Sequence, residues 1–151
     1  MLAELMVNKV LIISGCAWAL TQLLKVLLVL VNEKRLNLRY FVASGGMPSA
    51  HSALAAALCT SVAIRMGTTD PLFAVTLAFA AIVMFDAQSV RRAAGQQARV
   101  LNKMLDELFK THRFSHEHLA ELLGHTEVEV FLGLLMGVMV ALLVHAVAMV
   151  V

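Results

Sequence analysis

Apolar residues are concentrated in four segments, each near the roughly 20 residues that a helix needs to cross a bilayer. These segments are 10–31, 48–66, 71–90 and 129–151. The second is rich in alanine and has the weakest hydropathy, so we expect it to pack inside a bundle and to expose little surface to lipid. The pattern predicts an all-α fold, a polytopic membrane helix bundle formed by a single domain over residues 1–151.

The connections between these segments differ in character. Residues 67–70 form a short turn, so the second and third segments should make an antiparallel hairpin. Apolar residues at helical spacing in 91–128 predict a helical hairpin with a His-rich break at 111–118. The two long connections carry most of the basic residues, which are Lys34, Arg35, Arg39, Arg91, Arg92, Arg99, Lys103, Lys110 and Arg113.

This charge distribution predicts an orientation. With four crossings, both basic connections lie on the same face, and the positive-inside rule assigns that face to the cytoplasm. The 91–128 hairpin is then cytoplasmic, and both termini lie outside. We expect the protein to be an integral protein of the cell inner membrane.

Composition supports a membrane protein and excludes other classes. Of the 151 residues, 60% are hydrophobic and only 15% are charged, against roughly 25% charged in soluble domains. A disordered chain, a basic nucleic-acid-binding domain and a disulfide-stapled secreted module are excluded, so we expect no nucleic-acid partner. Cys16 and Cys59 both lie inside apolar runs and have neither disulfide nor zinc spacing.

Ionisable residues at membrane depth are costly and are therefore candidates for function. In the topology above they fall near the cytoplasmic ends of all four apolar segments, where they are able to line one pocket that opens on the cytoplasm. They are Lys25, His51, Asp86, Arg91, Arg92, His125 and Glu129.

The stretch 44–52, Ser-Gly-Gly-Met-Pro-Ser-Ala-His-Ser, has the features of a helix start. Its glycines give the backbone freedom, Pro48 suits a first turn, and Ser49 suits an N-cap. Backbone N–H groups at such a position favour phosphate, and His51 would lie beside it. The alternative is an ordinary loop and cap with an incidental histidine.

His125 and Glu129 are four residues apart, the spacing of one helix face. A carboxylate there can accept the Nδ1 proton of the imidazole, which fixes the tautomer and leaves Nε2 free as a nucleophile. The alternative is an interfacial His–Glu pair without a chemical role. Gly133 and Gly137 form a Gly-xxx-Gly step, which indicates close helix packing.

Taken together, three motifs in order give a resemblance that covers about residues 22–137. They are Gly-Gly-Met-Pro-Ser-Ala-His-Ser at 45–52, Phe-Asp-Ala at 85–87 followed by Val-Arg-Arg-Ala-Ala-Gly at 90–95, and Leu-Gly-His-Thr at 123–126 followed by Glu-Val at 129–130. The chain resembles the divergent membrane branch of the type-2 phosphatidic acid phosphatase and vanadium-dependent haloperoxidase superfamily, the acid phosphatase/vanadium-dependent haloperoxidase-related proteins.

The resemblance implies roles for three residues. His51 would be the general acid that protonates the leaving oxygen, in a Pro-Ser-Ala-His motif where Ala50 replaces the glycine of the superfamily pattern. His125 would be the nucleophile that forms a phosphohistidine. Glu129 would orient it, in place of the aspartate of the superfamily pattern.

The phosphate-binding elements depart from that pattern. No Arg-Pro follows Lys25 at the superfamily distance, and no Ser-Arg precedes His125. The cations must therefore come from Lys25, Arg91 and Arg92, with backbone amides near Gly46 and Ser49 as further donors to the phosphate.

Two further sets of residues invite a metal interpretation. Three roles are open for Asp86, namely pairing with an arginine, pairing with Lys25, or metal binding. A structural ion pair is favoured over the metal. His112, His116 and His118 fit a solvated loop better than a metal site, because only the first two share helical spacing. We expect no metal and no cofactor.

The resemblance thus implies a metal-independent, vanadate-sensitive membrane phosphatase acting on a phosphomonoester or pyrophosphate of a lipid or isoprenoid. The alternative is a non-catalytic protein that binds an anionic lipid headgroup or transports the lipid. A haloperoxidase-like vanadate site is disfavoured, since the absent arginines are those that would hold vanadate. A homodimer is compatible with four spans, because a second copy would bury polar helix faces.

Overall fold

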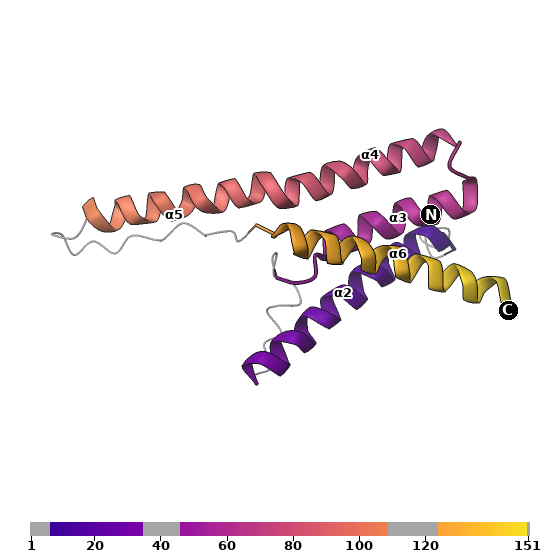
Figure 1. Cartoon of the computed structure of the whole chain (residues 1–151), viewed down its shortest axis with the longest axis horizontal. Helices are drawn as coiled ribbons and strands as arrows, with labels where there is room; N and C mark the ends of the chain where they lie inside the picture. The colour runs from indigo at the N-terminus through magenta and orange to yellow at the C-terminus, as the bar shows by residue number, and fades with distance from the viewer. Residues whose placement is uncertain (1–6, 35–45, 109–123, 151) are drawn as a thin grey trace.

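A computed structural model describes residues 7–34, 46–108 and 124–150, and all regular structure in these ranges is helical. In chain order the elements are α2 (Lys9–Glu33), α3 (Ala50–Met66), α4 (Pro71–Phe85), the π-helical turn η2 (Asp86–Val90), α5 (Arg91–Leu108) and α6 (Glu127–Val150). Figure 1 shows that the start of α2 and the end of α6 lie at the same end of the bundle as the α3–α4 turn. The predicted helical bundle is confirmed.

Three helical stretches are long and apolar enough to span a bilayer, namely Lys9–Val31, Pro71–Asp106 and Glu127–Met149. The fourth apolar helix, Ala50–Met66, has 17 residues and is therefore about 25 Å long. Many large apolar side chains on the outer surfaces of the helices are exposed. Such surfaces are stable only against lipid, so the molecule is a membrane protein.

Helix α3 lies at the centre of the bundle and packs against α2, α4 and α6. Its buried residues are almost all small, with alanine and serine predominant. Small side chains let neighbouring backbones approach closely, which replaces the hydrophobic driving force that lipid does not provide. The alanine-rich second segment therefore packs inside the bundle, as its weak hydropathy predicts.

The closest helix contact joins α3 and α6 through two glycines. A Cβ added at Gly133 would overlap the carbonyl oxygen of Ser49 and lie 3.0 Å from the Cβ of Ser52. A Cβ at Gly137 would overlap the carbonyl oxygen of Ala53 and lie 2.9 Å from its Cα. The Gly-xxx-Gly step therefore serves helix packing, as predicted, and it sets the register of α6 on α3.

The helical structure continues beyond α4, although the sequence becomes polar from Asp86 onwards. The elements α4, η2 and α5 follow one another without a break and form a single rod, which extends beyond the other helices (Figure 1). The polar half, α5, exposes Val100, Leu101 and Met104 on its apolar side. Of the predicted 91–128 hairpin, the first arm is thus helical, and its His-rich break at 111–118 lies outside the described residues.

Candidate functional site

The predicted His125–Glu129 pair is present, but His125 lies just before helix α6 rather than within it. Nδ1 of His125 is 2.8 Å from Oε2 of Glu129. The imidazole is 3% exposed and the carboxylate 17%. The carboxylate therefore holds the ring through Nδ1, the arrangement in which a neutral imidazole carries its proton on Nδ1 and has Nε2 free.

Thr126 completes this arrangement at the N-terminus of α6. The Thr126 amide donates to Oε2 of Glu129, and the Glu129 amide donates to Oγ1 of Thr126, each at 3.3 Å. This reciprocal pair is a capping box. One carboxylate oxygen thus caps the helix and orients the histidine, so its position is fixed by the backbone. Thr126 is not among the site residues predicted from the sequence, although Thr-x-x-Glu ahead of an apolar run is the signature of this cap.

The start of α3 lies directly against this helix start. Ser49 is the N-cap of α3, and its Oγ accepts from the amide of Ser52 at 3.4 Å and from the hydroxyl of Ser52 at 3.0 Å. Its own amide donates to the carbonyl oxygen of Glu129 at 3.0 Å. The motifs at 45–52 and 123–130 are therefore joined by one backbone hydrogen bond, and His51 is exposed in the adjoining first turn of α3.

Lys25 is buried in the bundle, with 3% of its surface exposed. Its stem packs on Gly46, where an added Cβ would lie 3.5 Å from the Lys25 Cδ. Gly46 has a φ of 83°, a conformation that favours glycine. The structure therefore places Lys25 against Gly46, three residues before Ser49, whose amide donates to the carbonyl oxygen of Glu129.

The residue after Asp86 contacts His125 through a hydrogen bond between backbone atoms. The amide of His125 donates to the carbonyl oxygen of Ala87, in η2, at 3.1 Å. Gly124 lies against Arg92, and a Cβ added to this glycine would lie 2.6 Å from the Arg92 Cβ. Nothing in the sequence pattern indicated either contact, because both are made by backbone atoms.

The remaining predicted site residues, Asp86, Arg91 and Arg92, lie in η2 and at the start of α5. Asp86 is half-buried at the first position of η2. Arg92 is exposed, and Arg91 begins α5, but its side chain lies outside the description. In the ranges that the structure describes, no three His, Cys, Asp or Glu residues come together as a metal site. His112, His116 and His118 fall outside those ranges.

An almost wholly apolar groove of about 470 Å³ begins at Met47 and Pro48, directly before Ser49. It lies between α2 and α6, and the segment Met47–Pro48, between Gly46 and Ser49, forms one end. Along α6 it runs from Leu132 to Leu143, about 16 Å at 1.5 Å per residue. That length is close to one leaflet, half of the roughly 30 Å hydrocarbon core. The lining residues are Leu24, Leu28, Met47, Pro48, Leu132, Leu135, Met136, Met139, Val140 and Leu143.

The sequence is similar to a protein family and to a bacterial membrane protein. Residues 6–140 match the family described as the divergent PAP2 family. The chain is 40% identical over 153 aligned positions to the uncharacterized membrane protein YuiD of Bacillus subtilis (strain 168), and the alignment covers 92% of this chain and 95% of that protein. No solved structure matches the chain. The resemblance identified from the three motifs is thus confirmed, and the chain belongs to the divergent PAP2 family.

Proposed function

We propose that this protein is a metal-independent phosphatase that hydrolyses a phosphomonoester or pyrophosphate of a lipid or isoprenoid at the cytoplasmic face of the inner membrane. One observation carries the proposal, namely the 2.8 Å hydrogen bond between His125 and Glu129 beside the N-terminus of α3. Binding a headgroup needs cations alone, whereas a histidine oriented by a carboxylate is the arrangement of an activated nucleophile.

In the first step, Nε2 of His125 attacks phosphorus and the bond from phosphorus to the ester oxygen breaks. His51 donates a proton to the leaving oxygen, so the products are an alcohol and phosphohistidine. In the second step, His51 takes a proton from water, the resulting hydroxide attacks phosphorus, and the N–P bond breaks to release phosphate. Glu129 keeps the proton on Nδ1 throughout and stabilises the charge that develops on the ring.

The phosphoryl oxygens require positive groups. Lys25 is one candidate, because it is buried beside Gly46, three residues before the N-cap Ser49. The amides at the start of α3, after Ser49, add partial positive charge from the helix N-terminus. Arg91 and Arg92 are further cations at the start of α5, and Asp86 is proposed to position them. The apolar groove would hold the hydrocarbon chain of the substrate in the bilayer.

One observation favours the alternative of headgroup binding or lipid transport without cleavage. The His125 ring is 3% exposed, so the ring or its covering must move before Nε2 can meet a phosphorus atom. A binding protein has no such requirement. The two functions are separated by measuring turnover together with binding.

The test is phosphate release by the purified protein from a panel of lipid and isoprenoid phosphates. We expect activity that vanadate inhibits and that His125→Ala and His51→Ala abolish. His145→Ala is the matched control, since this histidine lies near the other end of α6, about 30 Å from the site. Binding of the same lipids without any phosphate release by folded protein would refute the phosphatase and support the binding function.

A further inference from the structure

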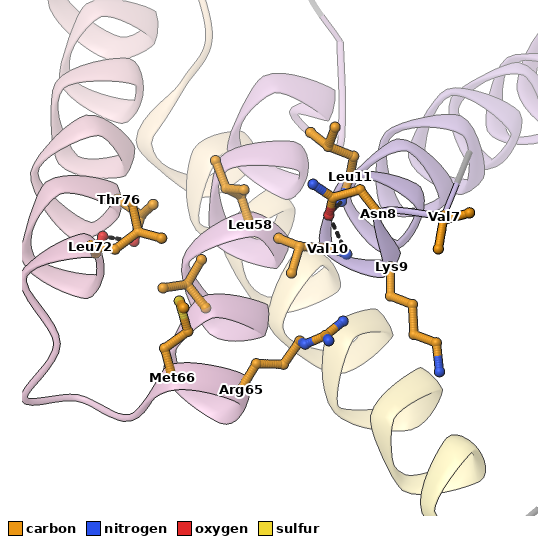
Figure 2. A pocket seen from close by; sticks show the side chains of 11 residues that line it. Val7, Asn8, Lys9, Val10, Leu11, Leu58, Arg65, Met66, Leu72 and Thr76 are labelled. Carbon is orange, nitrogen blue, oxygen red and sulfur yellow. Dashed lines mark hydrogen bonds between the residues drawn. The ribbon is translucent and has the colours of Figure 1, made fainter. Parts of the chain in front are cut away.

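A second cavity, of about 670 Å³, lies at the opposite end of the bundle (Figure 2). The start of α2, the last turns of α3 and the first turns of α4 form its walls. Arg65, near the end of α3, is about 24 Å from Ser49 along the helix axis. That distance approaches the roughly 30 Å hydrocarbon thickness of a bilayer. The cavity therefore belongs to the membrane boundary opposite to the candidate functional site.

Two cations from different helices line this cavity, Lys9 at the first position of α2 and Arg65 in the last turn of α3. Apart from Lys25, every other lysine and arginine of the chain lies in the two basic connections. Under the positive-inside rule, cations at the opposite end are unexpected. Among the described residues, neither Lys9 nor Arg65 forms an ion pair.

Two other polar side chains of the lining, Asn8 and Thr76, form hydrogen bonds within the protein. Asn8 accepts from the amides of Val10 and Leu11 through its side-chain oxygen, at 3.1 and 3.3 Å. The hydroxyl of Thr76 donates to carbonyl oxygens of α4 at 3.0 Å. Among the lining residues that the structure describes, Lys9 and Arg65 are the ones that carry a charge, and Figure 2 labels both beside the cavity.

The rest of the wall is apolar, and Leu58, Val62, Met66 and Leu72 represent it from α3 and α4. Free phosphate would satisfy the two cations but would leave this apolar surface uncovered. An amphiphile covers both, with its anionic group on Lys9 and Arg65 and its hydrocarbon chain along the leucines and valine. Arginine also suits phosphate because its planar guanidinium can donate two hydrogen bonds to phosphate oxygens.

We propose that this cavity binds the phosphate of an anionic phospholipid from the leaflet opposite to the candidate functional site. The lipid is a resident ligand and not the substrate, because the His125–Glu129 pair lies at the other end of the bundle. Bound there, it bridges the ends of α2, α3 and α4. Anything that binds only the folded state stabilises the fold in proportion to its occupancy.

The test is titration of the purified full chain in detergent with short-chain phosphatidylglycerol, phosphatidylcholine and glycerol 3-phosphate, followed by native mass spectrometry and thermal unfolding. We expect phosphatidylglycerol to bind about tenfold or more tightly than phosphatidylcholine, a difference of about 1.4 kcal/mol. The combined Lys9→Gln and Arg65→Gln variant should lose this preference. Lys103→Gln, an exposed cation on α5, should keep it.

Two results would overturn the proposal. The first is a preference for phosphatidylglycerol that survives in the double variant, which would place the headgroup elsewhere. The second is binding of glycerol 3-phosphate as tight as that of the lipid, which would make soluble phosphate the ligand. The His125→Ala variant should keep the preference, so failure of the proposed phosphatase activity and failure of this inference are distinguishable.

Discussion

The contact between α3 and α6 can be perturbed by the smallest possible change, Gly137→Ala. The added methyl group would overlap the carbonyl oxygen of Ala53, which cannot rotate away because it belongs to the backbone of α3. Overpacking of this kind costs about 1–3 kcal/mol. Alanine is favoured over glycine within a helix by about 1 kcal/mol, so the net destabilisation is about 0–2 kcal/mol.

Gly15→Ala is the matched control, because Gly15 lies in α2 and an added Cβ there has no neighbour within 4 Å. This variant gains the same helix preference of about 1 kcal/mol without the overlap. We expect the two variants to differ by about 1–3 kcal/mol, which is roughly 5- to 150-fold in the unfolding equilibrium. Reversible unfolding of the purified proteins in mixed micelles, followed by circular dichroism, measures this difference.

The same substitution should also affect the candidate site. The amide of Ser49 donates to the carbonyl oxygen of Glu129 one turn away from the glycine contacts. Separation of α6 from α3 would stretch this bond. The Gly137→Ala variant should therefore release phosphate more slowly, as well as being less stable. If Gly137→Ala is as stable as Gly15→Ala, the two glycines do not set the distance between the helices, and our account of the register is wrong.

Three further predictions concern the site and its orientation. Glu129→Gln should lower kcat by about 10²-fold or more, because an amide no longer fixes the His125 tautomer. Glu127→Gln, in the same turn, should leave kcat unchanged, and equal effects of the two variants would refute the orienting role. Met139→Trp should fill the apolar groove and lower kcat/KM by about tenfold for long-chain phosphates, without affecting short-chain phosphates. An equal loss for both kinds of substrate would show that the hydrocarbon chain of the substrate binds elsewhere. Thr69→Cys and Lys103→Cys, made in a chain without native cysteines, should react with an impermeant thiol reagent from opposite faces of the membrane, and labelling of both from outside would contradict the cytoplasmic site.

The elements that follow from periodicity and side-chain type were predictable from the sequence. The alanine-rich composition of α3 indicated its place inside the bundle, and Gly133 and Gly137 indicated a close helix contact. The spacing of His125 and Glu129 indicated their pairing, even though the histidine precedes α6. These predictions succeeded because each depends on residues close together in the chain.

Contacts between distant backbone atoms were not predictable in this way. Ser49 reaches Glu129 and His125 reaches Ala87 through amide and carbonyl groups that every residue carries, so no residue type marks them. The packing of Gly46 on Lys25 likewise depends on how the loop folds. The sequence becomes polar near Asp86, which indicates the end of a span. The helical structure nevertheless continues through η2 and α5, because a helix needs no change of direction to leave a membrane.

The wide turn η2 has a consequence for the angular phase of the long rod. Each residue of an α-helix advances about 100° around the axis, so residues five apart face about 140° away from each other. A π-helical turn bonds residues five apart and so returns them to nearly the same side. Ala87 and Arg92 are five apart, and both meet the 124–125 segment. Deleting one residue from 88–90 would rotate α5 by about 100° relative to α4, separating these contacts without changing one candidate site side chain. The site therefore depends on a residue count within the rod as well as on residue identity.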